Sequence, residues 1–239
     1  METLYKNSIK IVIGFLSVAV IFMIYYKYAN SAVKTFALAT ASKTIAIDPG
    51  HGGFDPGKVG TTEVYEKKIN LQISLKLRDY LEQSGAFVIM TRTEDVDLDG
   101  DDEKQSKRKD MVNRVEKVNN SGADILVSIH QNAFPQPQVK GAQVFYHNQS
   151  DKGKLLAQTI QKSIKTYADS ENKRVAKHNS DYYVLRVTKS PSVIVECGFL
   201  TNREEEAKLN TDKYQEEIAW SIYIGIVDYF QQEQNRQAE

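Results

Sequence analysis

The chain has 239 residues, and its 31 Lys and Arg residues balance its 31 Asp and Glu residues, for a formal net charge of +0 at pH 7. This length suits one sizeable hydrophobic core. Balanced charge, without a basic cluster interleaved with aromatic residues, argues against nucleic-acid binding. Cys197 is the only cysteine, which excludes an intrachain disulfide and a metal site made of several thiolates. A metal would have to be held by His and carboxylate groups.

The N-terminal part of the sequence contains an apolar, charge-free segment at residues 11–26. Lys6 and Lys10 precede it, and Lys27 closes it. As a helix it would extend roughly 24 Å at about 1.5 Å per residue, short of the ~30 Å hydrocarbon core unless the neighbouring tyrosines lie in the interfaces. The segment is therefore expected to meet a membrane, either as a short anchor or as a signal peptide.

We interpret residues 1–26 as this anchor or signal segment and residues 27–42 as a linker. Ala-x-Ala patterns in residues 37–42 suit signal cleavage, but they lie far beyond the apolar segment, so an uncleaved anchor is favoured over a secreted, cleaved protein. The lysines before the segment predict that residues 43–239 lie on the extracytoplasmic face of the membrane.

Short apolar segments in residues 43–239 predict strands. Segments such as Asp124-Ile-Leu-Val-Ser-Ile129 and Ser192-Val-Ile-Val195 are apolar at nearly every position, which is typical of strands covered on both faces. We expect strands at residues 44–48, 86–91, 123–130, 142–146 and 192–196.

Helical spacing separates these strands. Ile69, Ile73, Leu77 and Leu81 recur every four residues, and Ser84-Gly85 is a suitable end for that helix. Further helices are expected around residues 111–118, at 155–167 and at 214–230. Strands alternating with helices predict an α/β fold, a three-layer sandwich with a central, largely parallel sheet and helices on both faces.

Polar side chains capable of chemistry stand at the ends of the predicted strands. His51 follows the first strand, His130 ends the third, and Glu196 ends the fifth. Because the carboxyl ends of strands form the ligand crevice in open α/β sheets, these three groups should converge. Glu66 precedes the first helix. His51 also lies in a loop rich in glycine and proline, which permits tight turns and fixes the imidazole.

Two imidazoles and one carboxylate make a three-ligand zinc site with a fourth position open, which is typical of catalytic zinc. We therefore expect His51, Glu66 and His130 to bind one Zn²⁺. Glu196 is the candidate for the carboxylate that takes a proton from water and passes it to a leaving nitrogen. The sequence has no His-Glu-x-x-His helix, so the usual helical zinc-protease arrangement is excluded.

Simpler interpretations exist for several of these residues. Glu196 could form a buried ion pair with Arg92. Cys197 could be a nucleophile, although a small buried residue is the preferred interpretation. We expect His147 and His178 to be polar residues of the surface or cleft rim, and of the two we favour His178 as a substrate contact.

The sequences of four segments resemble the signature segments of the zinc-dependent N-acetylmuramoyl-L-alanine amidases. In order, they are Ile47–Gly57, Glu66–Leu71, Ser128–Ala133 and Val195–Asn202. The resemblance covers about residues 44–231. It implies that the protein hydrolyses the amide between the lactyl group of muramic acid and L-alanine of the peptidoglycan stem peptide.

The same resemblance implies zinc ligation by His51, Glu66 and His130 and catalysis by Glu196. Glu63 competes with Glu66 as the ligand, but Glu66 directly precedes the Lys-Lys-Ile-Asn-Leu segment that the family motif requires.

Further segments resemble the germination-specific branch of this family in spore-forming bacteria. They are the N-terminal anchor, the polar stretch before Asn113-Arg114, and Gly141–Tyr146. This resemblance implies action in the forespore intermembrane space, where such enzymes, with a deacetylase, form the muramic-δ-lactam of the spore cortex. It leaves open an activating lipoprotein partner. Two alternative functions also remain open: a zinc peptidase acting within the stem peptide, and a catalytically idle wall-binding protein.

Overall fold

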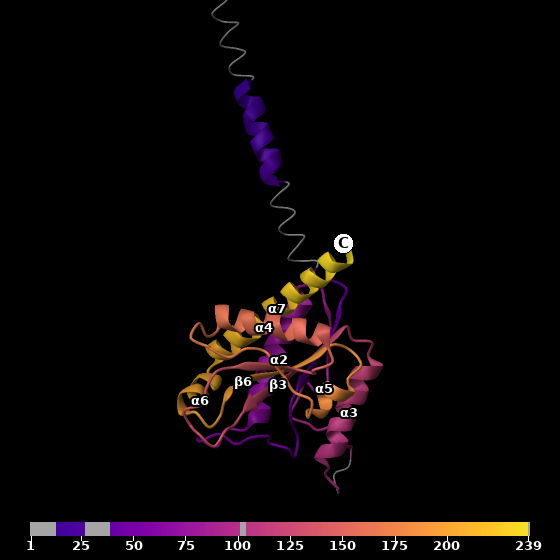
Figure 1. Ribbon diagram of the computed structural model, residues 1–239, viewed down its shortest axis with the longest axis vertical. Coiled ribbons are helices and arrows are strands. Elements are labelled where there is room, and N and C mark those ends of the chain that lie inside the picture. Colours follow the sequence, from indigo (N-terminus) through magenta and orange to yellow (C-terminus); the bar gives the residue numbers. More distant parts are fainter. Residues whose placement is uncertain (1–12, 27–38, 101–103, 239) are drawn as a thin grey trace, which may run out of the picture. The chain divides into compact units, whose positions relative to one another are not determined.

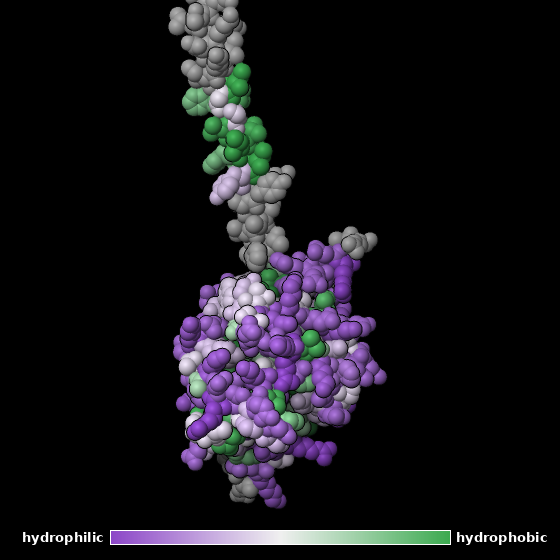
Figure 2. All heavy atoms as spheres, turned by 60° about the vertical axis from the view of Figure 1, so that its left-hand side comes forward, coloured by the Kyte–Doolittle hydropathy of each residue, from purple (hydrophilic) through white to green (hydrophobic). Residues whose placement is uncertain are grey.

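The computed structural model describes residues 13–26, 39–100 and 104–238. The chain divides into two compact units, Met1–Leu38 and Ala39–Glu239. In the first unit, residues 13–26 are helical and their large apolar side chains are exposed, as the green segment in Figure 2 shows. None of the helices among the described residues combines the length and the hydrophobicity of a membrane span. The rest of the predicted anchor, residues 1–12, and linker residues 27–38 lie outside the described residues.

A six-stranded sheet with the order β2-β1-β3-β6-β4-β5 forms the centre of the second unit (Figure 1). The strands β2, β1, β3 and β6 are mutually parallel, whereas β4 runs antiparallel to β6 and parallel to β5. The strands are β1 (Thr44–Pro49), β2 (Phe87–Met90), β3 (Ile125–Asn132), β4 (Gln143–Tyr146), β5 (Lys177–His178) and β6 (Ser192–Phe199). The predicted strands are all present, and β5 is additional.

Helices cover both faces of this sheet, which confirms the predicted three-layer α/β sandwich. One face packs against α2, α4 and α7, and the other against α3 and α5. The helices are α2 (Glu66–Gln83), α3 (Lys107–Asn120), α4 (Asp151–Tyr167), α5 (Tyr183–Val187), α6 (Arg203–Leu209) and α7 (Asp212–Ala238).

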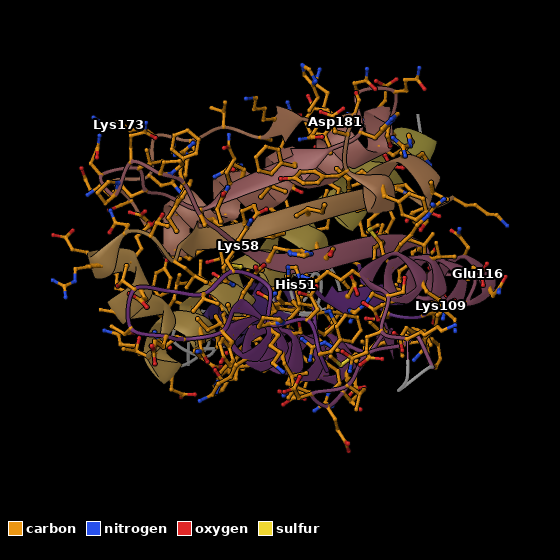
Figure 3. All side chains as sticks on the ribbon, turned by 90° about the horizontal axis from the view of Figure 1, so that it is seen from below. His51, Lys58, Lys109, Glu116, Lys173 and Asp181 are labelled. Atoms are coloured by element: carbon orange, nitrogen blue, oxygen red, sulfur yellow. The ribbon has the colours of Figure 1, made fainter. Side chains whose placement is uncertain are left out.

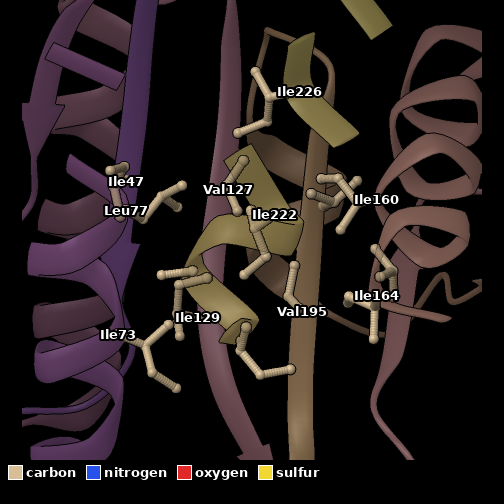
Figure 4. Packing of buried hydrophobic residues seen from close by; sticks show 14 of the residues in the cluster. Ile47, Ile73, Leu77, Val127, Ile129, Ile160, Ile164, Val195, Ile222 and Ile226 are labelled. Carbon is tan, nitrogen blue, oxygen red and sulfur yellow. The ribbon is translucent and has the colours of Figure 1, made fainter. Parts of the chain in front are cut away.

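The larger core lies between the sheet and α2, α4 and α7. Figure 4 shows alternate residues of β1, β3 and β6, such as Ile47, Val127 and Val195, directed toward apolar side chains of these helices, including Leu77 and Ile222. Because the side chains of a strand alternate between faces, the intervening residues of the same strands meet α3 and α5. Each central strand is thus buried on both sides, which accounts for its nearly continuous apolar sequence.

The compact unit begins a few residues before the predicted boundary at residue 43. Ala39 and Thr40 are buried, and the Ser42 backbone N–H donates to the Gly85 carbonyl. These residues, which we assigned to the linker, therefore form part of the folded unit.

The helices α4 and α7 approach each other closely at Gly225. A Cβ atom added to Gly225 would lie 2.5 Å from the Cα of Ile160 and 2.8 Å from its backbone nitrogen. Because these are backbone atoms, they cannot be displaced by a rotamer change, and the two helices depend on the absence of a side chain there.

We predict that Gly225→Ala destabilises the protein by about 1–3 kcal/mol through overpacking. This outweighs the about 0.5–1 kcal/mol by which alanine is favoured over glycine inside a helix. Urea denaturation measures the change in the free energy of unfolding. The control, Lys213→Ala, lies at an exposed position of the same helix and should stay within about 0.5 kcal/mol of the parent. A stabilised Gly225→Ala variant would contradict the prediction.

Candidate metal centre

The topology brings the predicted site residues to one end of the sheet. His51 lies two residues after the end of β1, His130 lies near the end of β3, and Glu196 lies on the neighbouring strand β6 in register with His130. Residues paired in this way point to the same face, and their strands are about 4.8 Å apart. Glu66 is the first residue of α2. Figure 3 shows His51 near the middle of this end of the molecule.

His51, Glu66 and His130 form a cluster that could hold a metal ion, because one ligand atom from each lies within 4.8 Å of the others. Glu66 bridges the two imidazoles: its Oε2 is 3.2 Å from His51 Nε2, and its Oε1 is 3.0 Å from His130 Nδ1. Glu63, the competing candidate, is exposed and does not belong to this cluster.

The Glu66 carboxylate is only 1% exposed. Its oxygens also accept hydrogen bonds from the backbone N–H groups of Lys58 at 2.8 Å and Gln131 at 3.0 Å. Burial alone would raise the pKa of Glu66, but hydrogen bonds and charge from His130 and His51 hold it well below its usual value. Glu66 also stands at a helix N-terminus, where the helix dipole favours an anion. The group is therefore kept ionised, as a metal ligand must be.

Whereas His130 lowers the pKa of Glu66, Glu66 raises the pKa of His130. Burial lowers the pKa of His130, but its hydrogen bond to Glu66 and the Glu66 charge raise it to about 9. The paired carboxylate and imidazole thus favour a positive charge at this position. Because metal binding to histidine and carboxylate groups releases protons, this arrangement fits a divalent ion.

Buried arginines fix the loop that carries His51. Arg114 donates to the carbonyls of Pro49 at 2.8 Å and His51 at 2.6 Å, and Arg92 donates to the carbonyls of Pro49 at 2.9 Å and Gly50 at 3.1 Å. His51 itself has a φ of 62°, which is unusual for a residue other than glycine. The arginine contacts hold consecutive carbonyls in place and so sustain this conformation.

Asp48 and Arg114 form a buried ion pair beneath the loop. Arg114 Nη1 lies 3.0 Å from Asp48 Oδ1, and the hydroxyls of Thr91 and Ser128 each donate to Asp48 at 2.7 Å. Although burial alone raises the pKa of Asp48, Arg114 and the hydroxyl donors lower it to about 2. Asp110 occupies the other side of the guanidinium, 2.7 Å from Arg114 Nε.

Two glycines are required by close approaches at the site. A Cβ on Gly50 would lie 2.2 Å from the His130 ring, and one on Gly57 would lie 2.6 Å from Glu66 Oε2. Gly57 also has a φ of 72°, in the left-handed region that favours glycine. The backbone of this loop therefore packs directly against the side chains of His130 and Glu66.

Asp55 is a site residue to which sequence analysis assigned no role. Its Oδ2 lies 2.7 Å from His51 Nδ1, and Lys107 lies 2.6 Å from its Oδ1. A carboxylate on the far nitrogen of a histidine fixes the tautomer and orients the other nitrogen toward a metal, which here is Nε2, the atom facing Glu66. Its spacing four residues after His51 in the same loop was the available signal.

Glu196 is buried beside the cluster, and its Oε2 has no hydrogen-bond partner among the described residues. Burial raises its pKa to about 7.

Sequence analysis also missed Tyr182, whose phenol interacts with the Glu196 carboxylate. Burial and, second to it, the charge of Glu196 raise the pKa of Tyr182 to about 12. Arg92 donates to backbone carbonyls and forms no ion pair with Glu196 within the described chain. A buried carboxyl group with an unused oxygen is suited to exchanging a proton.

The remaining candidates lie outside the cluster. Cys197 is fully buried, and burial raises the pKa of its thiol, so a thiolate nucleophile is disfavoured. His178 is exposed on β5, and His147 is partly exposed after β4. Neither belongs to the group of potential metal ligands.

Glu206 on α6 forms hydrogen bonds with the turn at Thr61 and Thr62, which precedes Glu66. This buried carboxylate accepts hydrogen bonds from the Thr61 hydroxyl and from both the backbone N–H and the hydroxyl of Thr62. A segment following β6 thus holds the loop that joins the two candidate ligands His51 and Glu66.

Comparison with known proteins places this geometry in a family. The sequence profile described as N-acetylmuramoyl-L-alanine amidase matches residues 45–228. The chain belongs to the N-acetylmuramoyl-L-alanine amidase family. It is therefore a hydrolase that acts on peptidoglycan, which confirms the function expected from the sequence and disfavours the two alternatives.

Individual members of the family are similar over most of the chain. The germination-specific N-acetylmuramoyl-L-alanine amidase of Bacillus subtilis is 36% identical over 217 residues, covering 89% of this chain and 91% of that protein. The CwlD amidase of Clostridioides difficile, solved in complex with the GerS lipoprotein, is 45% identical with a TM-score of 0.76, covering 79% of this chain and 98% of that one. An N-acetylmuramoyl-L-alanine amidase from Clostridium difficile 630 is 37% identical, with a TM-score of 0.69 and coverages of 79% and 96%.

We predict that Arg114→Met destabilises the protein by about 3–5 kcal/mol, because it leaves the buried Asp48 carboxylate without its counter-charge. This is a large share of the about 5–15 kcal/mol that is typical of total stability. Chemical denaturation measures the loss. The control, Arg108→Met, changes an exposed arginine of the same helix and should have little effect. Equal stabilities for the two variants would show that the ion pair does not hold the loop.

Proposed function

We propose that this amidase uses one zinc ion held by His51, Glu66 and His130, and that Glu196 is its catalytic carboxylate. The observation that carries the proposal is the convergence of the three ligand atoms within 4.8 Å next to a buried carboxyl group with an unpaired oxygen. Two imidazoles and a carboxylate are a donor set typical of catalytic zinc.

Bound zinc would supply Lewis-acid chemistry, polarising the scissile carbonyl and making water a better nucleophile. The protein residues handle the proton. Glu196 takes it from the attacking water and passes it to the leaving amide nitrogen. Its pKa of about 7 suits both steps, because a group with this pKa gains and loses a proton readily near neutral pH. Asp55 keeps the His51 ring oriented, and Tyr182 limits the movement of the Glu196 carboxylate.

We further propose that the enzyme acts in spore cortex modification and germination. The similarity to the germination-specific amidase of Bacillus subtilis supports this role. The CwlD amidase, which was solved with the GerS lipoprotein, supports an activating lipoprotein as a partner. Residues 1–26 would anchor the chain in the membrane with residues 43–239 on the extracytoplasmic side, a proposal that rests on the charge and hydrophobicity of the N-terminal sequence.

We predict that Asp55→Asn weakens zinc binding by about 10- to 100-fold, because the variant loses the charge that orients His51. Competition with a chelator measures the zinc dissociation constant. Asp95→Asn is the control, because Asp95 bonds to Lys67 and the Gly53 backbone of the same region without touching His51. An unchanged zinc affinity in Asp55→Asn would mean that the backbone contacts alone orient the ring.

The function itself is tested by digesting purified peptidoglycan with the zinc-loaded full-length chain and identifying the products by mass spectrometry. We expect intact stem peptides to be released. Glu196→Gln should reduce the rate by about 10²–10⁴-fold while retaining zinc, whereas Glu66→Gln should lose zinc. Glu204→Gln, an exposed position of α6, is the control.

The products distinguish the possible outcomes. Shortened peptides would indicate a peptidase acting within the stem peptide. No release by a zinc-loaded chain, with and without a lipoprotein partner, would indicate a binding protein. Full activity of Glu196→Gln would overturn its role in proton transfer.

A further inference from the structure

Most basic side chains around the metal-binding loop already have acceptors. Lys67 lies 2.8 Å from Asp95 and also donates to the Gly53 carbonyl at 2.7 Å. Lys107 pairs with Asp55 at 2.6 Å. Arg92 and Arg114 are buried and donate to the backbone of the loop. None of these groups is free to receive a substrate.

Lys58 differs from them. Its side chain is exposed, and within the described parts of the chain no ion pair or hydrogen bond involves its ammonium group. Figure 3 shows Lys58 next to His51 at the end of the molecule where the metal ligands lie. Within the described part of the chain, Lys58 thus places an unpaired ammonium group at the edge of the centre.

The backbone of Lys58 is tied to a metal-site residue. Its N–H donates to Glu66 Oε2 at 2.8 Å, and its carbonyl accepts from the Glu66 N–H at 2.9 Å. The side chain therefore starts from a fixed point beside the Glu66 carboxylate and is exposed to solvent. By ordinary bond lengths the ammonium nitrogen extends about 6 Å from its Cα.

This reach matches a definite part of the substrate. A peptide advances about 3.3–3.6 Å per residue, so groups one or two residues beyond the scissile amide lie within range of Lys58 when the amide is at the centre. A lysine ammonium recognises an anion, and carboxylates are the anionic groups that a peptide carries.

We propose that Lys58 is a binding site for a carboxylate of the peptide, within about two residues of the amide that is cut. The inference rests on the proposed function, because it places the amide at the zinc centre. The carboxylate has two possible sources: the second residue of the peptide, or a peptide C-terminus at that position. Lys58 thereby favours peptides that are acidic there over peptides in which the same group is amidated.

The test uses the zinc-loaded full-length chain and synthetic N-acetylmuramoyl dipeptides. The side chain of the second residue carries either a free carboxylate or the corresponding amide. Each of these two substrates is made with a free and with an amidated C-terminus. We expect the parent enzyme to prefer one acid form about two- to fivefold in kcat/KM, mainly through KM, as for an exposed charge pair. The preference should weaken as ionic strength rises. Comparing the substrates with free and amidated C-termini identifies which carboxylate is bound.

Lys58→Gln should abolish the preference by lowering kcat/KM on the preferred acid form, and Lys58→Arg should retain it. Lys68→Gln is the matched control, since Lys68 is exposed and has no ion pair within the described residues. Equal rates of the parent on acid and amide forms, or an unchanged preference in Lys58→Gln, would overturn the inference and leave the amidase function intact. Hydrolysis of none of the substrates would instead count against the proposed function.

Discussion

A buried ion pair between Asp48 and Arg114 fixes the position of the loop that carries His51. The strand β1 carries the buried carboxylate of Asp48 one residue before its end, and such a charge is tolerated only when its partners surround it. Arg114 satisfies the carboxylate and then uses its remaining donors on the loop carbonyls that follow it. The electrostatic requirement of the strand end therefore becomes a positional constraint on His51.

The two carboxyl groups of the centre have opposite electrostatic environments, although both are buried. Glu66 is surrounded by donors and is kept charged, whereas Glu196 has few donors and holds a proton more readily. These environments suit Glu66 to the proposed ligand role and Glu196 to the proposed proton exchange, since a ligand must stay ionised and a proton carrier must not. The start of helix α2 and the strand β6 thus supply two carboxyl groups with different protonation behaviour.

Much of this structure could be predicted from the sequence because the signals are local. The buried strands and the four-residue spacing in α2 follow from hydrophobic periodicity, and the convergence of His51, His130 and Glu196 follows from a parallel sheet. The strand β5 has only two residues, which leaves no periodicity to detect. Asp55 and Tyr182 acquire their roles from the loop conformation and from tertiary packing, so their residue types alone do not disclose them. In contrast, α6 had a usable signal, since Asn202 caps it and glutamates follow.

The short strand β5 limits strand pairing between molecules at one edge of the sheet. A sheet edge exposes unpaired backbone groups that can recruit a strand from another molecule. Here one edge ends in only two residues, Lys177 and His178, both exposed and polar, and the opposite edge is the four-residue β2. Edges this short offer little template for intermolecular pairing, which protects the continuous apolar strands at the centre of the sheet from seeding aggregation.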